Sequence, residues 1–355
     1  QIARLSVEEL AQLEQEIASW VGEDRKENAL YYYKPNNERV RLIHESTAKT
    51  IGVGGGNRSG KTDSVLAEIA ALCTGIVPES LSTSEAFRSK FRGPIQVRIV
   101  CESLTTTLAP VMLRKLRWYA WNGNDRPGGP RGHFGWIPKD ALIEGSWEKS
   151  WSEKQRTLRI LYRDPDRPDV IEGESSIQFM SKDQDPSDHA SGEFHIVGLD
   201  EPPSFPIWTE SIARVMSLGG RIYLMMTWPD DPSFPCEWIF DEVYDKAQPG
   251  PGKDPHTDWI NLYTTENPNI DQAEVAIRAA QMSESERAVR IYGQPIRFSN
   301  RIHPLFTDQT QSWCFKCGAV VITQSYKCLT CGSDAVEFTH VEPVLPNPSF
   351  PVIRV

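Results

Sequence analysis

The clearest pattern in the chain is a pair of short apolar runs with a helical stretch between them. Residues 195–199 and 221–226 are almost continuously apolar, and residues 207–218 have helical character. Strands that are buried on both faces have this composition, and a helical crossover between two of them is typical of a parallel sheet. The runs at 50–53 and 95–100 are also suited to strands. The pattern predicts an α/β fold with a central, mostly parallel sheet flanked by helices.

Weaker patterns predict the remaining elements. Residues 6–21 begin with a capping box, Ser6 followed by Glu9, and continue with apolar residues at helical spacing. We expect this amphipathic helix to pack on the main domain; docking to a partner is the alternative. The other expected elements are a polar extended stretch from 31–35 onward, a helix over 108–121, a loop over 122–135, paired strands over 156–162 and 176–180, a surface loop over 248–255 and helical structure over 271–292.

The composition restricts the possible partners. The 355 residues carry a formal net charge of −10, so contact with nucleic acid through the whole surface is excluded and any such contact must be local. No apolar run is long enough to span a bilayer, and the N-terminus lacks a signal-peptide pattern. We therefore expect a soluble, intracellular protein. The first residue is Gln1, so we expect that the natural start has been removed.

Residues 55–62 read G-x-x-x-x-G-K-T, the sequence of a phosphate-binding loop between a strand (50–53) and a helix (64–72). Glycines let the backbone wrap a triphosphate and direct successive N–H groups at its oxygens. Lys61 would then lie at the β and γ phosphates, and Thr62 would supply a hydroxyl to Mg²⁺. A glycine-rich turn that matches by chance is the alternative. The predicted nucleotide-binding residues of this loop are Gly55, Gly56, Asn57, Arg58, Ser59, Gly60, Lys61 and Thr62.

The apolar run at 195–199 is followed by Asp200 and Glu201, which gives it the form of a Walker B element. The carboxyl edge of an open α/β sheet is where ligands collect. Asp200 would hold Mg²⁺ through water, and Glu201 would orient and deprotonate the water that attacks the γ-phosphate. Strands often end in acids, which is the alternative. Together with the phosphate-binding loop, the pair predicts a P-loop NTPase of the RecA/ASCE type.

Two further residues are candidates for the chemistry. Thr227 ends the apolar run at 221–226, where its hydroxyl would reach the γ-phosphate or the attacking water; a threonine that only caps the strand is equally compatible with the sequence. Arg58 lies inside the phosphate-binding loop, where it would stabilise charge that develops during hydrolysis. An arginine paired with a nearby acid is the alternative.

Four of the seven cysteines form two C-x₂-C-G knuckles, Cys314 with Cys317 and Cys328 with Cys331. Four thiolates at this spacing satisfy a tetrahedral zinc ion with no open position, so the site would be structural. Disulfides are the alternative, and they are a poor one for an intracellular chain. The knuckles predict a small zinc ribbon over 314–331 that needs its metal to fold.

The order of these motifs resembles the ATPase domain of bacteriophage large terminase subunits, the motors that package DNA into a procapsid. The matching residues are Gly54–Thr62, Gly198–Pro202, Leu224–Thr227, Thr265–Pro268 and Arg290–Gly293, and the resemblance extends from about residue 30 to 306. It implies that Lys61 and Thr62 bind phosphate and magnesium, that Asp200 binds the metal, that Glu201 is the catalytic carboxylate and that Thr227 couples hydrolysis to movement. Arg58 matches an arginine often found in the loop of this family.

The resemblance also implies the partners of the protein. These are double-stranded DNA bound without sequence specificity, a portal protein and a small terminase subunit, with several copies of this chain in a ring on the procapsid. The expected location is the host cell cytoplasm during assembly, with no membrane contact and no retention in the mature virion. Arg114, Lys115, Arg117, Arg126 and Arg131 are candidates for DNA contact, although a solvated helix face is equally compatible with them.

The chain departs from the family pattern at two places. No glutamine that would read adenine occurs near residues 36–39, and residues 350–355 resemble the first strand of the family's nuclease, interrupted before its first acid. We therefore expect no DNA cleavage and a truncated chain. The expected organisation is a helical region over 1–30, an ATPase domain over 31–300, and a linker with the zinc ribbon and the start of a nuclease over 301–355.

Two other classes of function remain compatible with the motifs. One is a helicase or remodelling ATPase of the Asp-Glu type, which requires a second RecA-like domain to close over the nucleotide. The other is a nucleotide-binding scaffold without hydrolysis, against which the position of Glu201 argues.

Overall fold

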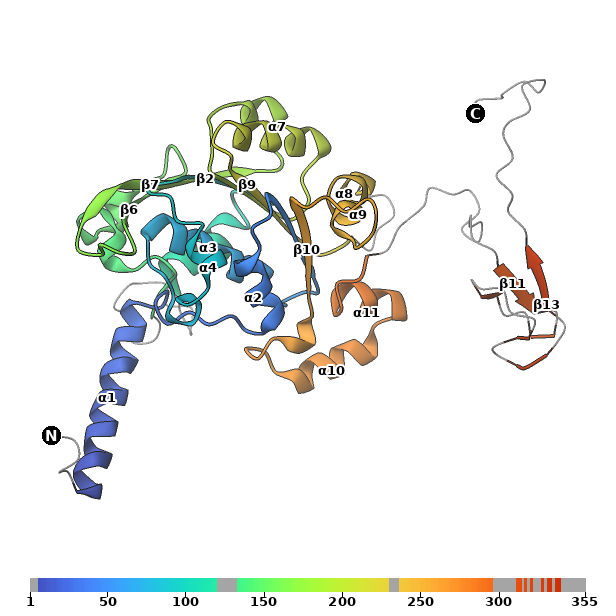
Figure 1. Cartoon of the computed structure of the whole chain (residues 1–355), viewed down its shortest axis with the longest axis horizontal. Coiled ribbons are helices and arrows are strands. Elements are labelled where there is room, and N and C mark those ends of the chain that lie inside the picture. Colours follow the sequence, from blue (N-terminus) through green and yellow to red (C-terminus); the bar gives the residue numbers. More distant parts are fainter. Residues whose placement is uncertain are drawn as a thin grey trace. The chain divides into compact units, whose positions relative to one another are not determined.

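The computed structural model describes residues 6–119, 133–229 and 236–295, together with parts of the segment 311–339 (Figure 1). The chain divides into two compact units, Gln1–Ile296 and Arg297–Val355. Among the described residues, no helix combines the length and the apolar character that crossing a membrane requires.

The first unit is built on an eight-stranded sheet in the order β10–β1–β9–β8–β2–β7–β6–β5. All neighbours from β10 to β7 are parallel, whereas β6 and β5 are antiparallel. The predicted mostly parallel sheet is confirmed. The strands are β1 (Thr50–Gly55), β2 (Gln96–Cys101), β5 (Trp151–Ser152), β6 (Thr157–Arg163), β7 (Ile171–Ser181), β8 (Ile196–Asp200), β9 (Arg221–Met226) and β10 (Thr257–Leu262).

Helices cover both faces of this sheet. In Figure 1, α3 (Lys61–Thr74) lies on one side of the strands and α7 (Phe205–Met216) on the other. The side chains of β9 alternate between the two faces. Tyr223 and Met225 join the core beneath α3, whereas Leu224 joins the core with Trp208 of α7. Since every residue of β9 is buried, its continuous apolar sequence follows directly from its central position.

The other helices are α1 (Val7–Glu27), α2 (Glu38–Glu45), α4 (Glu85–Arg88), α5 (Arg114–Arg117), α6 (Trp147–Ser150), α8 (Glu237–Ile239), α9 (Asp245–Ala247), α10 (Gln272–Gln281) and α11 (Glu284–Arg290). Most of them are short. π-Helical segments precede α5 (Leu108–Leu113) and α9 (Phe240–Tyr244).

Several boundaries differ from the sequence predictions. The helix predicted over 108–121 ends at Arg117, because Trp118 is extended and opens β3 (Trp118–Tyr119), which pairs with β4 (His133–Phe134). The stretch after residue 35, predicted to be extended, contains α2, which Asn37 caps. The helical region over 271–292 is two helices, because Ser283 begins a new capping box.

The amphipathic helix α1 forms as predicted, and Ser6 and Glu9 make the expected capping box. Three of its apolar residues, Ile17, Trp20 and Val21, are exposed and do not pack on the domain as predicted. Trp20 alone keeps 76% of its surface accessible.

A buried polar cluster joins α3 to the sheet. The carboxylate of Glu68 accepts hydrogen bonds from Lys90 Nζ (2.7 Å) and the Tyr223 hydroxyl (2.6 Å), and its other oxygen lies 2.8 Å from His44 Nδ1. His44 Nε2 lies 2.8 Å from the Tyr33 hydroxyl. Burial alone would raise the pKa of Glu68, but the charge of Lys90 and the contact with His44 hold this pKa at about 2. Glu68 is therefore a buried carboxylate that stays ionised.

The second unit contains a small antiparallel sheet in the order β12–β11–β13. Its strands are β11 (Gln311–Cys314), β12 (Val320–Val321) and β13 (Val336–Thr339). The segment 350–355, predicted to begin a nuclease, lies outside the described residues, as do Arg126 and Arg131.

Candidate active site

Three chain segments meet at the carboxyl edge of the sheet. The phosphate-binding loop follows β1, Asp200 and Glu201 end β8, and Thr227 follows β9. The strands are parallel, so their carboxyl ends lie at one edge, as the sequence predicted. β1 and β8 are not direct neighbours in the sheet, because β9 lies between them. This inserted strand places Thr227 between the loop and the acids.

Thr62 and Asp200 are in direct contact. The Thr62 hydroxyl donates a hydrogen bond of 2.7 Å to Asp200 Oδ1, although the two residues are 138 positions apart in the chain. Burial raises the pKa of Asp200, while this hydrogen bond and the charge of Lys61 lower it. A hydroxyl and a carboxylate held side by side at the start of α3 are oxygen ligands of the kind that Mg²⁺ takes in nucleotide sites. The first unit has the fold of a P-loop NTPase.

Lys61 is folded back onto the loop. Its Nζ donates to the carbonyls of Gly55 (3.0 Å) and Gly56 (2.8 Å) and to the hydroxyl of Thr227 (3.0 Å). Only 7% of Lys61 is exposed, and burial lowers the pKa of its ammonium, which Glu201 and Asp200 counteract. A buried ammonium whose partners are neutral oxygens is suited to exchange them for phosphate oxygens.

Glu201 has an unusual backbone conformation and an unusual proton affinity. Its φ angle is +69°, in the left-handed region that residues with a Cβ rarely adopt. Burial raises the pKa of the Glu201 carboxyl to about 7, with the charge of Lys61 opposing and that of Asp200 adding to the shift. Its Oε2 accepts a hydrogen bond from the backbone N–H of Thr227 (3.3 Å). A carboxyl that titrates near neutral pH is suited to accept a proton from water.

Thr227 connects the two halves of the site. Its hydroxyl receives the hydrogen bond from Lys61 and lies 3.4 Å from the side-chain oxygen of Asn57, while its N–H reaches Glu201. These contacts go beyond the capping of a strand, which was the alternative interpretation of this threonine.

Arg58 is exposed at the tip of the loop, with φ at +59°. Within the described part of the chain no acid pairs with its guanidinium, so the ion pair considered as the alternative does not form there. Its carbonyl accepts a hydrogen bond of 2.7 Å from Asn267 Nδ2, which fixes the loop backbone. This contact does not hold the exposed side chain.

Two segments that the sequence analysis matched without assigning a role support the loop from outside. Asn57 N–H donates to the carbonyl of Arg290 (2.7 Å), and Asn267 Nδ2 donates to the carbonyl of Arg58 (2.7 Å). Thr264, directly before the segment 265–268, donates from its hydroxyl to the carbonyl of Asn57 (2.7 Å). Gly293 has φ at +58°, and a Cβ at this position would lie 2.3 Å from the Cα of Gly55. Glycine at 293 therefore lets the segment 290–293 lie directly on the loop.

A cavity of about 710 Å³ opens beside the loop. Besides residues 58–63, Asn36, Lys115, Trp136, Asn267 and Asn269 line it. Asp63 accepts from Lys115 Nζ (3.1 Å) and from the indole N–H of Trp136 (3.1 Å), which fixes both groups at the cavity wall. The sequence analysis missed Trp136, Asn36 and Thr264, since no motif marks them; Asn267 falls within the matched segment 265–268.

Two of the residues considered for DNA contact, Lys115 and Arg117, have local partners. Lys115 belongs to the cavity wall through Asp63, and Arg117 lies over the ring of Trp147 (5.0 Å) near Glu148 (3.7 Å). The interpretation of this helix as a freely solvated face therefore does not hold for Lys115 or Arg117.

The four cysteines of the second unit come together as predicted. Their sulfur atoms all lie within 4.8 Å of one another, and the pairs Cys314–Cys331 and Cys317–Cys328 are each separated by 3.6 Å. None of the four forms a disulfide. A tetrahedral zinc ion with Zn–S bonds of about 2.3 Å places its sulfurs about 3.8 Å apart. The spacing of the thiols therefore fits such an ion.

No family model and no curated protein matches the sequence. Solved structures of phage proteins do match it. A point variant of the large terminase ATPase domain of Thermus phage P74-26 is 17% identical over 76% of this chain and 97% of that chain, with a TM-score of 0.47. The unmodified domain is 14% identical, covering 76% and 96%, with a TM-score of 0.45.

The large terminase of another thermophilic bacteriophage, in complex with ADP, is 10% identical over 74% of this chain, with a TM-score of 0.45. The chain spans 53% of that protein's length.

Proposed function

We propose that this chain hydrolyses ATP at the carboxyl edge of its sheet. The observation that carries the proposal is the contact of Thr62 with Asp200, with Glu201 directly beside it and Lys61 across the site. ATP bound at this edge with Mg²⁺ would provide the activated phosphoanhydride bond that is hydrolysed. The loop N–H groups and Lys61 would hold its phosphates, and Thr62 and Asp200 would hold the metal.

Glu201 is the residue proposed to take a proton. It lies at the buried edge of the site, and the N–H of Thr227 orients one of its oxygens. Its other oxygen is available to orient a water molecule for attack in line with the γ-phosphate. The exposed guanidinium of Arg58 is placed to stabilise negative charge on the phosphates as it develops.

Within the same proposal, hydrolysis drives the translocation of double-stranded DNA by a viral terminase. The combination of motifs supports this assignment: besides Walker A and Walker B, the chain carries Leu224–Thr227, Thr265–Pro268 and Arg290–Gly293, and all three segments contact the phosphate-binding loop. The partners would be the DNA phosphate backbone, which suits a motor that must ignore sequence, a portal, a small terminase subunit and further copies of this chain. The four cysteines would hold a structural zinc ion.

Turnover of ATP tests the hydrolysis directly. We expect Glu201→Gln to bind a fluorescent ATP analogue but to hydrolyse ATP at least about 100-fold more slowly, because the proton acceptor is removed. Lys61→Ala should lose most of its nucleotide affinity. The exposed Glu148→Gln is the matched control and should behave as the wild type.

The hydrolysis proposal fails if the wild type binds ATP but its turnover is unchanged by both active-site substitutions. Linear duplex DNA tests the motor assignment separately: a translocating ATPase should hydrolyse faster in its presence. Intact hydrolysis without any response to DNA, portal or small subunit would leave an ATPase but not a packaging motor.

A further inference from the structure

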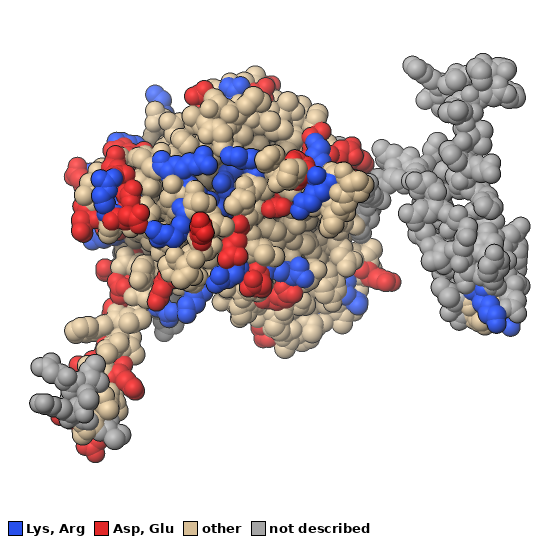
Figure 2. Space-filling model, in the orientation of Figure 1, with Lys and Arg blue, Asp and Glu red and all other residues tan. Residues whose placement is uncertain are grey.

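Three cationic side chains and a histidine lie at the amino edge of the sheet, opposite the active site. Lys49 directly precedes β1, Arg92 lies ahead of β2, His195 directly precedes β8, and Arg221 is the first residue of β9. One cavity is lined by Arg92, His195 and Arg221 together, and Lys90 joins them in its wall. Figure 2 shows Lys and Arg side chains gathered in a band just below α7. The active site uses none of these residues.

Arg221 carries charge that its surroundings balance only in part. It is 9% exposed, and its Nη1 atom is buried without a hydrogen-bond partner among the described residues. Burial lowers the pKa of its guanidinium, but Tyr223 and Glu68 raise it further, so the group stays charged. Lys90 already neutralises Glu68 at 2.7 Å, and two buried cations thus share one buried carboxylate. Because an incompletely paired buried charge is costly, binding of an additional anion at this edge of the sheet would be favourable.

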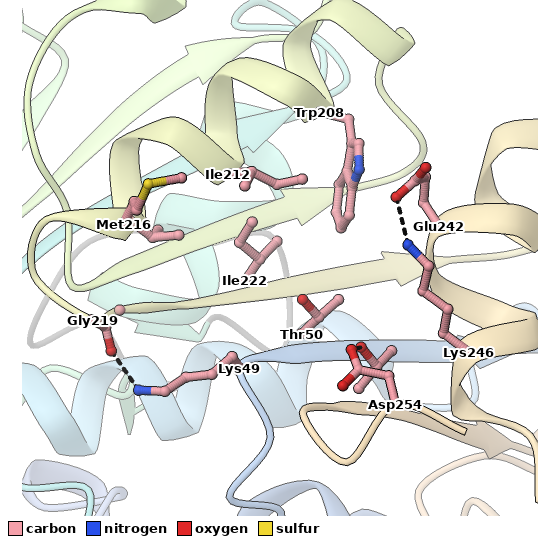
Figure 3. A pocket seen from close by; sticks show the side chains of 13 residues that line it. Lys49, Thr50, Trp208, Ile212, Met216, Gly219, Ile222, Glu242, Lys246 and Asp254 are labelled. Atoms are coloured by element: carbon pink, nitrogen blue, oxygen red, sulfur yellow. Dashed lines mark hydrogen bonds and ion pairs between the residues drawn. The ribbon is translucent and has the colours of Figure 1, made fainter. Parts of the chain in front are cut away.

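Lys49 and Arg92 add positive charge at the surface of the same cluster. Lys49 reaches this cluster through Gly219, which lines the cavity and accepts its hydrogen bond. Burial, and after it the charges of Arg92 and Arg221, lowers the pKa of Lys49. The Lys49 ammonium has a neutral partner, the carbonyl of Gly219 at 2.5 Å (Figure 3). Arg92 is exposed and forms no ion pair within the described ranges.

The acids beside Lys49 have other partners. Glu242 pairs with Lys246, and the carboxylate of Asp254 accepts hydrogen bonds from the backbone of His256 and the hydroxyl of Thr257. Lys49, Glu242 and Asp254 line a second pocket, which shares Gly219 with the cavity of Arg92, His195 and Arg221. Figure 3 shows Glu242 and Asp254 on the side of this pocket away from the contact of Lys49 with Gly219. Arg92 also lines a pocket with Asp164, Asp166 and Glu172, of which Asp166 pairs with Arg88 and Glu172 with Arg167. None of these acids forms an ion pair with Arg92, His195 or Arg221 among the described residues.

His195 supplies a neutral donor to the cluster. Its Nδ1 accepts a hydrogen bond of 3.1 Å from the backbone N–H of Gln96. Burial and the charge of Arg92 lower the pKa of the imidazole, so the neutral ring is favoured and its single proton is on Nε2. The Nε2–H group has no partner among the residues that the structure describes.

We propose that Lys49, Arg92 and His195, supported by the buried charge of Arg221, bind a phosphate group at the amino edge of the sheet. An ammonium, a guanidinium and a neutral imidazole N–H provide charge-assisted and neutral donors to phosphate oxygens. Two sources share this chemistry, the backbone of duplex DNA and a free phosphate ion. The duplex is the source that follows from the proposed function, on which this arm of the inference rests.

The test uses the double variant Lys49→Gln/Arg92→Gln. Lys149→Gln/Arg278→Gln is the matched control, because it likewise removes one lysine and one arginine, whose side chains are 53% and 65% exposed and do not line the pockets of Lys49 or Arg92. A fluorescein-labelled duplex of about 30 base pairs, long enough to cover a standard protein–DNA interface, is titrated by anisotropy over a range of salt concentrations. Inorganic phosphate is titrated by ³¹P NMR line broadening, and ATP turnover without DNA is measured in parallel.

If duplex DNA is the ligand, the double variant should bind it more than about tenfold more weakly, and the slope of log affinity against log salt should decrease by about 2. The control should retain wild-type affinity and slope. If free phosphate is the ligand, duplex affinity should be equal in all proteins and phosphate broadening should decrease only in the double variant, to the level that the nucleotide site alone produces. The proposal is overturned if neither ligand distinguishes the double variant from its control.

ATP turnover without DNA distinguishes this proposal from the hydrolysis proposal, because we expect it to be unchanged in both variants. The amino edge is remote from Lys61 and Glu201, so loss of phosphate binding there should leave basal turnover within about twofold of the wild type.

Discussion

Backbone strain marks the active site at the scale of single residues. Only four non-glycine residues in the described part of the chain have positive φ, and two of them, Arg58 and Glu201, lie at the nucleotide site. Such conformations cost roughly 1–3 kcal/mol each and persist where the surrounding structure imposes them. Two hydrogen bonds hold Glu201 in this conformation: its N–H donates to the carbonyl of Met225, and its carboxyl accepts from the N–H of Thr227.

The raised pKa of Glu201 predicts a pH-dependent stability. In the unfolded chain this carboxyl titrates near its ordinary value of 4.5, whereas in the folded protein burial raises the pKa to about 7. Between these values the folded state holds a proton that the unfolded state has released, so rising pH favours unfolding. Glu201→Gln removes the titrating carboxyl and therefore this loss of stability at higher pH. It should be more stable than the wild type by on the order of 2 kcal/mol at pH 8, with a smaller difference at pH 5.

Urea denaturation of the nucleotide-free proteins at both pH values measures this difference. The exposed Glu148→Gln should show no such trend. A stability difference that stays constant from pH 5 to pH 8 would mean that the carboxyl of Glu201 is not desolvated in the folded protein.

At the scale of elements, the phosphate-binding loop depends on segments far away in the sequence. The segments 264–267 and 290–293 donate to or accept from the backbone of Asn57 and Arg58. The loop is thereby held in shape before any nucleotide binds, which lowers the ordering cost of binding.

The contact of Gly293 with Gly55 predicts a selective effect on nucleotide affinity. In Gly293→Ala the new Cβ would lie 2.3 Å from the Cα of Gly55, so the loop backbone must move. We expect the affinity for ATP to fall by about tenfold or more, measured with a fluorescent ATP analogue. Gly219→Ala is the matched control, because φ is +57° there and no atom lies within 4 Å of the added Cβ.

Both glycine variants should lose about 1 kcal/mol of stability from the left-handed conformation, and Gly293→Ala should lose more because its Cβ also meets the backbone of Gly55. Equal nucleotide affinities in the two variants would show that close packing of residues 290–293 does not shape the loop.

The sequence predicts the central strands well, because β8 and β9 are buried on both faces and therefore continuously apolar. It does not reveal β10, an edge strand whose middle four residues are only partly buried, so neither alternation nor an apolar run marks it. It also hides α2, whose eight residues include only three apolar side chains. Among the site residues, motif spacing identifies Lys61, Thr62, Asp200 and Glu201. Trp136 reaches the cavity only through the tertiary fold, which no local pattern encodes.

At the scale of the whole molecule, the two units have different sources of stability. The first unit buries two apolar clusters on the two faces of a large sheet. The second has three strands of two to four residues and four clustered thiols. A ribbon this small buries too little apolar surface to fold without a further constraint.

We therefore predict that the second unit can lose its metal while the first unit keeps its ATPase activity. Protein purified without chelator should contain one zinc per chain by elemental analysis, and Cys328→Ser should lose most of it. Cys236→Ser, which changes a cysteine of the first unit, should keep the metal. The variant Cys328→Ser should retain ATP turnover, because the nucleotide site lies entirely in the first unit. Wild-type protein without zinc would refute the metal assignment.

The position of β9 has a consequence for communication across the domain. One rigid strand of six residues begins at Arg221, beside the cationic cluster, and ends next to Thr227, which touches both Lys61 and Glu201. A ligand that shifted this strand along its axis would alter the contacts of both active-site groups together. Thermodynamic reciprocity then requires that nucleotide occupancy change affinity at the far end by the same factor, so a probe at either end could report on the other.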